Sequence, residues 1–347
     1  LTISAYLVGF SVFHLACGPL ADRFGRRPVV LAGLALYALA TVACAMAETI
    51  EQLIAFRLVQ GIGACVGPTL GRTIARDLYG PQGAARALAM IAMVMALAPA
   101  VAPTLGSLLL AVLPWPWIFL SLAAYSVLVA LIVGYRLPES VPVRQALHPA
   151  NIARNYGILL RHRQFRETTV ASALLYAGMV CFLSGASFVF IDMMGVPLQY
   201  FGALFLTTVA GYVGGSALSA RLAMRRSSEA VMWLGGLAAT AGAALILLGP
   251  IVWFHPASIV LPMALYVGGV GIALPHSMAT ALRPFAEMAG TASALFGFIQ
   301  MGLSAAAGAI VGVLLDDSPL PMGAAILVCS LLSLVLIRRL HRSDMAY

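Results

Sequence analysis

The chain has 347 residues, of which 62% are apolar and only 9% are charged, with a formal net charge of +8. Soluble domains carry roughly 25% charged residues, so a soluble protein of this length would lack the charges to cover its surface. Composition therefore excludes the soluble classes and predicts a polytopic membrane protein. The apolar segments are continuous, which also excludes a barrel of strands that alternate in polarity every second residue.

Apolar windows of about 20 residues predict helices long enough to cross a bilayer. Eleven such windows occur, at residues 3–17, 28–47, 52–71, 86–111, 116–135, 167–190, 201–222, 230–253, 258–281, 288–315 and 319–337. We therefore expect an all-α membrane fold.

All 20 basic residues are arginine. Apart from Arg57, they fall at alternate junctions between the predicted helices, and the intervening junctions hold only acids. The positive-inside rule predicts that the arginine-bearing junctions are cytoplasmic. The net charge thus reflects membrane topology, and a nucleic-acid partner is not expected because the arginines are spread over separate short loops.

The same topology places the C-terminus in the cytoplasm and Leu1 on the outer side. The sequence opens inside an apolar window and without Met. We therefore expect a twelve-helix protein whose first helix lies upstream of the given sequence.

The first junction, residues 18–28, holds three arginines and one aspartate in a tight turn. It resembles the loop between the second and third helices of major facilitator superfamily transporters. The positions that match are Gly18, Asp22, Arg23, Gly25, Arg26 and Arg27. The resemblance implies that Asp22 locks the two halves by facing the positive end of a helix in the second half, and that the arginines bridge helix ends. A loop that only sets topology is the alternative.

Arg57 is predicted to lie inside the bilayer, where a charge is costly unless it faces a cavity or a partner. Gln60 shares its helix face, and the run resembles the fourth-helix motif of the superfamily. The resemblance implies a role in proton transfer. Because arginine does not deprotonate, that role would be to lower the pKa of a nearby carboxylate. No acid lies deep in a predicted span, and the resemblance implies one in the upstream helix. An Arg57 that snorkels toward Glu51 is the alternative.

Two prolines in the predicted span 86–111 indicate a kinked helix. Pro99, Pro103 and Gly106 resemble part of the antiporter motif of drug exporters, and a static kink is the alternative. Together with the runs 72–77, which ends in Asp77, 275–276 and 289–295, they resemble the bicyclomycin- and chloramphenicol-resistance (Bcr/CflA) branch of drug:proton antiporters.

The longest polar stretch separates two groups of predicted helices. We expect an N-terminal half at residues 1–136, lacking its first helix, a cytoplasmic linker at 137–165 and a six-helix half at 166–347. Within the linker, residues 151–163 are interpreted either as a helix on the inner leaflet or as a solvated connector. A faint repeat of the first junction, at residues 215–226, supports two related halves.

A drug site needs apolar and aromatic walls with a few polar anchors. The candidates are Tyr6, Phe10, Tyr176, Phe182, Tyr266, His276, Phe296 and Gln300. His276 is interpreted either as a substrate ligand that titrates near neutrality or as a structural residue, and His14 is expected to be structural. The five scattered cysteines predict neither a disulfide nor a metal site.

The resemblance implies an inner-membrane exporter that uses the proton gradient to expel hydrophobic antimicrobials by alternating access. Its expected partners are a small hydrophobic substrate, protons and the lipid bilayer, and we expect a monomer. No cofactor and no enzymatic activity are expected. ATP-driven pumping by this chain is not expected either, because it has no lysine and no phosphate-binding loop motif. A metabolite or amino-acid exporter on the same scaffold and a non-transporting membrane protein remain as alternatives.

Overall fold

The computed structural model describes residues 1–139, 149–315 and 318–344. Within these ranges, the side chains of residues 76, 80–89, 92–100, 103–104, 149–152, 199, 286–287 and 342–344 are outside the description. Every regular element in the described part is helical. The prediction of an all-α fold is confirmed.

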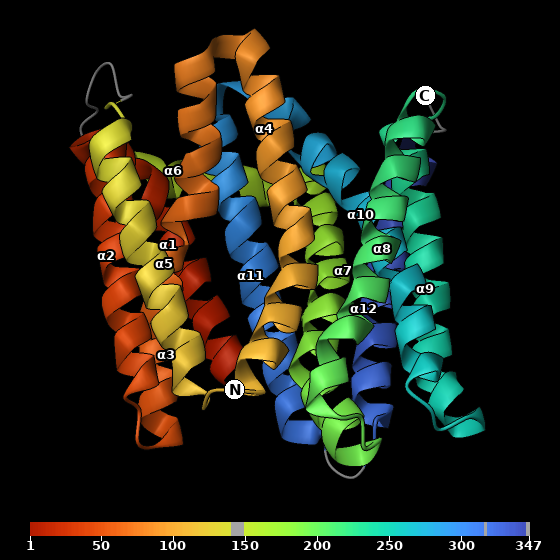
Figure 1. Ribbon diagram of the computed structural model, residues 1–347. Coiled ribbons are helices and arrows are strands. Elements are labelled where there is room, and N and C mark those ends of the chain that lie inside the picture. The colour runs from red at the N-terminus through yellow and green to blue at the C-terminus, as the bar shows by residue number, and fades with distance from the viewer. Residues whose placement is uncertain (140–148, 316–317, 345–347) are drawn as a thin grey trace.

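The helices stand side by side in two groups (Figure 1). The first group comprises α1 (Thr2–Phe24), α2 (Arg26–Ala45), α3 (Ile50–Ala64), α4 (Val66–Leu110) and α5 (Pro116–Arg136). After α6 (Pro149–Arg161), the second group comprises α7 (Arg163–Ser187), the π-helical turn η1 (Phe188–Met193), α8 (Leu198–Ala223), α9 (Ser228–Val252), α10 (Ala257–Leu282), the short 3-10 helix η2 (Arg283–Met288), α11 (Ala289–Leu314) and α12 (Leu320–Asp344). Between the groups, α1 packs on α11 and α4 packs on α8.

Among the described residues, ten helical segments are long and apolar enough to cross a membrane. They correspond to ten of the eleven predicted spans. The remaining prediction, residues 86–111, falls mostly on side chains outside the description. A straight helix with the 45 residues of α4 would be about 68 Å long, more than twice the hydrocarbon thickness. Figure 1 shows α4 instead as two limbs joined at the top of the view.

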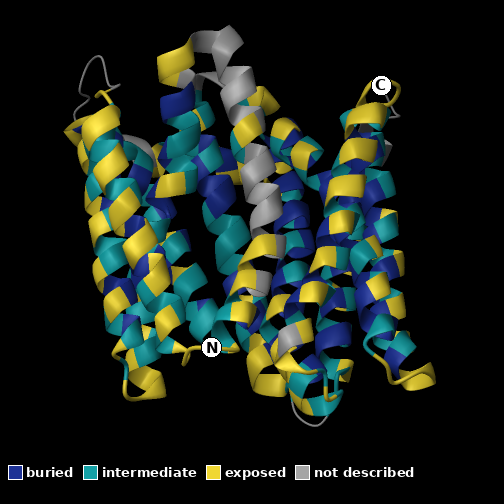
Figure 2. Ribbon diagram, in the orientation of Figure 1, coloured by how far each residue is buried: buried dark blue, intermediate teal, exposed yellow. Residues whose placement is uncertain are grey.

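Each group has its own apolar core. In the first, Cys17 and Ala21 of α1 pack with Val30, Val66 and Leu70. In the second, a larger cluster joins α7, α9, α10 and α12 around wholly buried Met232, Tyr266 and Ile326. Exposed side chains lie mainly on the outer flanks (Figure 2), where α5 presents large apolar residues such as Leu128 and Leu131. Such surfaces suit contact with lipid.

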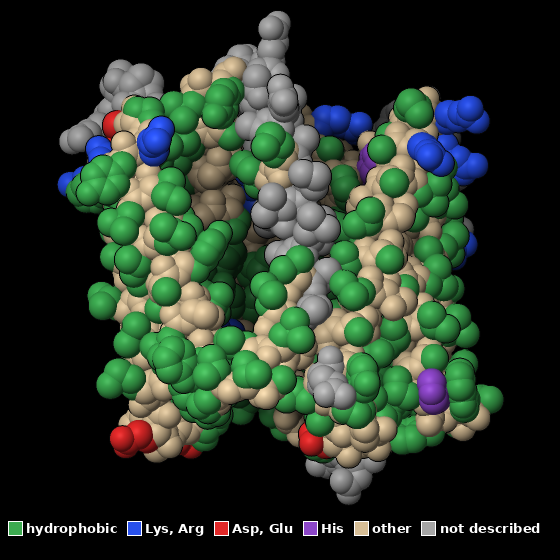
Figure 3. Space-filling model, in the orientation of Figure 1, with side chains coloured by type: hydrophobic (Ala, Val, Ile, Leu, Met, Phe, Trp, Pro, Cys, Tyr) green, Lys and Arg blue, Asp and Glu red, His purple; other side chains and the backbone are tan. Residues whose placement is uncertain are grey.

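The two ends of the molecule differ in the sign of their charged side chains. Arginine side chains gather at the upper end of Figure 3, and acidic side chains appear mainly at the lower end. We call the end that holds Arg23, Arg136, Arg225 and Arg283 the arginine-bearing face, and the opposite end, which holds Glu48, Glu51 and Asp192, the acidic face. The N-terminus lies at the lower end and the C-terminus at the upper end (Figure 1).

The linker contains the helix α6, which covers most of residues 151–163, interpreted above either as a helix on the inner leaflet or as a solvated connector. Leu159 on α6 is wholly buried with Phe165, Leu295 and Phe296. The Tyr156 hydroxyl donates a hydrogen bond to the carbonyl oxygen of Leu15 at 3.2 Å, and burial raises the pKa of Tyr156, which keeps this donor protonated. The apolar side of α6 therefore packs on both helix groups, a setting that neither interpretation of the linker included.

Candidate functional site

The two helix groups touch along α1 and α11. Ser11 Oγ donates a hydrogen bond to the carbonyl oxygen of Phe298 at 2.8 Å. Glycines on α11 allow the close approach: a Cβ built on Gly308 would lie 3.5 Å from Ser4 Oγ, and one built on Gly297 would lie 2.5 Å from His14 Nε2. This contact runs from the acidic end of α1 to its middle.

Beyond His14, toward the arginine-bearing face, a cavity of about 530 Å³ lies between the groups. This volume is within the range typical of small-molecule sites. Residues of α1, α2, α4, α6, α10, η2 and α11 line it: His14, Gly18, Pro19, Asp22, Arg26, Thr69, Leu70, Arg72, Thr73, Tyr156, Met278, Leu282, Met288, Ala289, Gly290, Thr291, Ser293 and Ala294. The cavity is thus closed by helix contact toward the acidic face.

His14 forms the inner end of the cavity and is itself buried. Its Nδ1 lies 3.6 Å from Cys65 Sγ, and its ring is 5.7 Å from the ring of Phe10. His14 therefore contacts α1, α3–α4 and α11 at the point where the two groups separate.

The first junction contacts the end of α5 and the residues that follow it. Gly25 has φ +100°, a conformation that glycine adopts without strain, and a side chain there would collide with the carboxylate of Glu139. The backbone N–H of Arg26 donates to Glu139 Oε1 at 2.9 Å, and Arg27 donates to the carbonyl oxygen of Gly134. These contacts fix the junction to the end of α5.

Asp22 and Arg26 extend from this junction into the cavity. Arg26 forms an ion pair with Asp77 and lies 3.8 Å from Asp22. Asp77, from the run 72–77, is thereby joined to the first junction. Arg23 instead lies over the ring of Phe24. Asp22 shares the cavity with Ala289 and Gly290, which begin α11.

The repeat at residues 215–226 makes a different contact. Gly215 packs against the backbone of Gly268, and buried Ser219 donates from Oγ to the carbonyl oxygen of Ile272 at 3.0 Å. This copy fastens α8 to α10 within one group. The first copy differs because Asp22 faces the space between the groups.

Arg57 belongs to a separate buried network. Its Nη1 donates to Gln60 Oε1 at 2.6 Å, and Gln60 Nε2 donates to Thr41 Oγ1 at 2.7 Å. Gln60 and Thr41 are wholly buried. The guanidinium lies 4.6 Å from the ring centre of Tyr6. Arg57 is seven residues into α3, about 10 Å along its axis.

The hydrogen bond of Arg57 leads to Gln60, which is deeper in the helix, and away from Glu51. Close packing of α1 on α3 sets the position of Tyr6, since Gly61 touches the backbone of Tyr6 and Gly9 touches that of Leu58. Within the described part of the chain, Arg57 forms no ion pair.

The residues predicted to bind substrate are dispersed over several helices. Tyr6 and Phe10 lie on α1, with ring centres 6.3 Å apart, and Tyr176 is half-buried on α7. Phe182 and Tyr266 belong to the core of the second group, where the Tyr266 hydroxyl donates to the carbonyl oxygen of Leu175 at 2.7 Å.

Two further candidates lie on α11. Phe296 is buried beside α6, and Gln300 Nε2 lies 3.5 Å from Ser172 Oγ. None of the eight predicted substrate residues is among those that line the 530 Å³ cavity.

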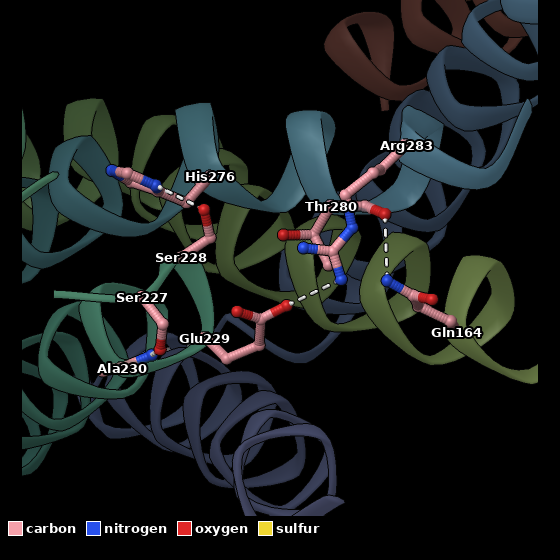
Figure 4. A network of polar contacts seen from close by, with 8 residues as sticks. All are labelled: Gln164, Ser227, Ser228, Glu229, Ala230, His276, Thr280 and Arg283. Carbon is pink, nitrogen blue, oxygen red and sulfur yellow. Dashed lines mark hydrogen bonds and ion pairs between the residues drawn. The ribbon is translucent and has the colours of Figure 1, made fainter. Parts of the chain in front are cut away.

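His276 belongs to a polar network at the arginine-bearing end of the second group (Figure 4). Its Nδ1 lies 3.3 Å from Ser228 Oγ. Nearby, Arg283 forms an ion pair with Glu229 at 3.5 Å, and Gln164 donates to the carbonyl oxygen of Thr280 at 3.3 Å. The network ties α7, α9 and α10 together.

The predicted antiporter motif is only partly described. The side chains of Pro99 and Pro103 lie outside the description. At Gly106, no atom of the described chain lies within 4 Å of a built Cβ.

Sequence reasoning missed most of the cavity wall. Arg72 belongs to the run 72–77, which suggested the family but no binding role for Arg72. The sequence also did not indicate the following lining residues as binding residues: Thr69, Thr73, Tyr156, Thr291 and Ser293. The available signal was the presence of polar side chains on the helix turns next to the first junction and in the run 289–295.

Comparison with known proteins places these features in a family. The model of the Major Facilitator Superfamily matches residues 1–309. A Bacillus subtilis protein described as an uncharacterized MFS-type transporter, YdgK, is 29% identical over 337 residues, which cover 96% of this chain and 83% of that protein. A bicyclomycin resistance protein homolog of Haemophilus influenzae is 27% identical over 342 residues, covering 96% and 84%.

The multidrug transporter MdfA of Escherichia coli O157:H7 is 26% identical over 307 residues, covering 86% of this chain and 74% of MdfA. Among solved structures, the xylose transporter XylE of E. coli aligns with a TM-score of 0.73 at 12% identity, covering 97% of this chain and 86% of XylE. The nucleoside transporter NupG aligns with the same score at 15% identity, covering 97% and 89%. With the helical fold, the first junction and the family match in agreement, the chain belongs to the major facilitator superfamily, a family of membrane transporters and not of enzymes.

Proposed function

We propose that this protein is a proton-coupled exporter of small hydrophobic compounds, including antimicrobials, that works by alternating access. One observation carries the proposal: the 530 Å³ cavity lies between the two helix groups, at the arginine-bearing face. A carrier of this architecture binds its substrate between its halves and exposes it to one side at a time. The relatives described as multidrug and bicyclomycin resistance proteins favour drugs as the cargo.

The orientation follows from charge. The positive-inside rule makes the arginine-bearing face cytoplasmic, so the C-terminus and the cavity face the cytoplasm in the bacterial inner membrane. In this arrangement the α1–α11 contact closes the outer side. Transport is proposed to be carried out by a monomer.

Asp22 is proposed to stabilise the opposite, outward-facing state. It shares the cavity with the first residues of α11, and the start of a helix carries a partial positive charge. Closing the cavity would bring the carboxylate toward that end. Gly18, which has no described atom within 4 Å of a built Cβ, leaves the approach free.

Arg57 is proposed to act in proton coupling. Gln60 accepts from one end of the guanidinium and is itself held by Thr41, and within the described residues Nε and Nη2 make no hydrogen bond. A carboxylate that accepted from these donors would have a lowered pKa, and loss of its proton would then be linked to movement of the helices. Tyr6, which lies against the guanidinium, would shield the pair from lipid.

Transport in proteoliposomes tests the proposal. The full-length protein should concentrate rhodamine 123 in vesicles with an acidic lumen and should lose this activity when nigericin collapses the gradient. Uptake that does not depend on the gradient would contradict proton coupling.

The polar wall of the cavity favours a second candidate, an exporter of metabolites or amino acids. Expression in a drug-hypersensitive strain separates the two, since a drug exporter raises the inhibitory concentration of at least one compound in a panel. An unchanged panel would favour the metabolite, and a protein that moves neither compounds nor protons would be a non-transporting membrane protein.

A further inference from the structure

Among the described residues, one charged side chain of the cavity wall has no ion-pair partner. Three charged side chains line it: Asp22, Arg26 and Arg72. Arg26 is paired with Asp77 and lies 3.8 Å from Asp22, whose side chain is 49% exposed. Arg72 forms no ion pair with any described residue. Arg72 is therefore the arginine of the cavity wall that has no acidic side chain within ion-pair distance among the described residues.

Arg72 is held in place by its own helix. Its Nε donates to the carbonyl oxygen of Pro68, one turn earlier, at 2.9 Å. Its two terminal nitrogens make no hydrogen bond within the described part of the chain, although the residue is half-buried. A guanidinium presents its terminal N–H groups as a planar fork that matches a carboxylate or phosphate. In a partly desolvated cleft this attraction is stronger than in bulk water.

Hydroxyl groups line the same cavity as this cation. On the opposite wall, Thr291 and Ser293 of α11 line the cavity and make no hydrogen bond with described residues, so both are available as donors to an anion. On α4, Thr69 Oγ1 already donates to Cys65 at 2.7 Å, and Thr73 Oγ1 donates to Thr69 at 3.3 Å. These two oxygens remain as acceptors for a donor group of a ligand.

Apolar side chains also line the cavity, among them Leu70, Met278, Leu282 and Ala294. On the basis of the proposed function, in which this cavity holds the cargo, we propose that the protein takes amphiphilic substrates with an apolar body and an oxyanion, and that Arg72 is the anchor for the oxyanion. Among hydrophobic compounds, those that carry a carboxylate or a similar anion would then be the preferred cargo.

Two dyes with one xanthene skeleton test the charge preference. Fluorescein is an anion with a carboxylate at pH 7.5, and rhodamine 123 is a cation in which that group is a methyl ester. Binding is followed by fluorescence anisotropy with the full-length protein in detergent, and empty micelles correct for partition of the dyes. Wild-type protein should bind fluorescein, and Arg72→Gln should weaken that affinity by about ten-fold or more.

The matched control is Arg225→Gln, which removes the same charge from an exposed turn at the same face and should leave both affinities unchanged. Arg72→Lys should recover part of the affinity for fluorescein, which also shows that the fold tolerates change at this position. Affinity of Arg72→Gln for rhodamine 123 should be unchanged or tighter. The proposal is overturned by a change in fluorescein affinity below two-fold, by equal weakening of both dyes, or by an equal effect of Arg225→Gln.

Transport keeps this proposal separable from the proposed function. If gradient-driven uptake of rhodamine 123 is present but fluorescein does not bind, the anion site is refuted and export stands. If fluorescein binds through Arg72 but no compound moves in proteoliposomes, the anion site stands and export is refuted.

Discussion

Replacing Gly297 by alanine should separate the two helix groups at their crossing. A Cβ at this position would lie 2.5–2.9 Å from three atoms of the His14 ring, whereas ordinary contact begins at 3.4 Å. The ring would have to retreat by about 0.9 Å, the difference between 3.4 and 2.5 Å. Phe10 and Cys65 contact the ring and limit its retreat, so α1 and α11 must move apart.

Overpacking of this kind typically costs about 1–3 kcal/mol. At roughly 2 °C for each kcal/mol, the apparent melting temperature in detergent should fall by about 2–6 °C. Gly214→Ala is the matched control, because a Cβ there meets no described atom within 4 Å. That variant should be neutral or slightly stabilising, since alanine favours a helix over glycine. Melting is read from the fraction of monodisperse protein that survives a series of heating steps.

A double-mutant cycle isolates the contact. With His14→Ala already present, Gly297→Ala should cost much less, which gives a coupling energy of about 0.5–3 kcal/mol. Strictly additive effects, or a Gly297→Ala variant as stable as Gly214→Ala, would show that the steric reasoning is wrong.

Three further predictions concern the first junction and the Arg57 network. Arg57→Ala should abolish gradient-dependent export while membrane insertion persists, and retained proton-driven uptake would refute its role. Asp22→Asn should slow turnover with little change in substrate affinity, so an unchanged transport rate in proteoliposomes would count against the gating role. Gly25→Ala should destabilise the protein by at least about 1–2 kcal/mol, because an L-residue is strained at φ +100° and because its side chain meets Glu139; a melting temperature equal to that of wild type would contradict this.

The membrane class and most of the spans were predictable because bilayer thickness fixes the length of an apolar helix. Charge at the junctions was sufficient to predict that the termini lie at opposite faces, as Figure 1 shows. The residues of the first junction were sufficient to suggest the family, because the spacing of its two glycines, its aspartate and its three arginines matches the motif of that family.

The sequence did not predict which side chains within the spans face the protein core, the cavity or lipid. Phe182 and Tyr266 were expected on a binding wall but lie in a packed core. Lipid and protein interior are both apolar, so the hydrophobic pattern does not distinguish a residue that faces a core from one that faces lipid or a cavity.

The sequence by itself determined the helical class, the number and direction of most spans, and the position of Arg57 inside one of them. Only the tertiary structure decided that Thr41 binds Gln60, which in turn binds Arg57, and that Arg72, Tyr156 and Ser293 share one cavity. The physical reason is that local sequence sets the length and end charges of each helix, whereas the cavity is formed by helix faces from segments more than 200 residues apart in the chain, brought together by glycine-mediated packing that no periodic pattern records.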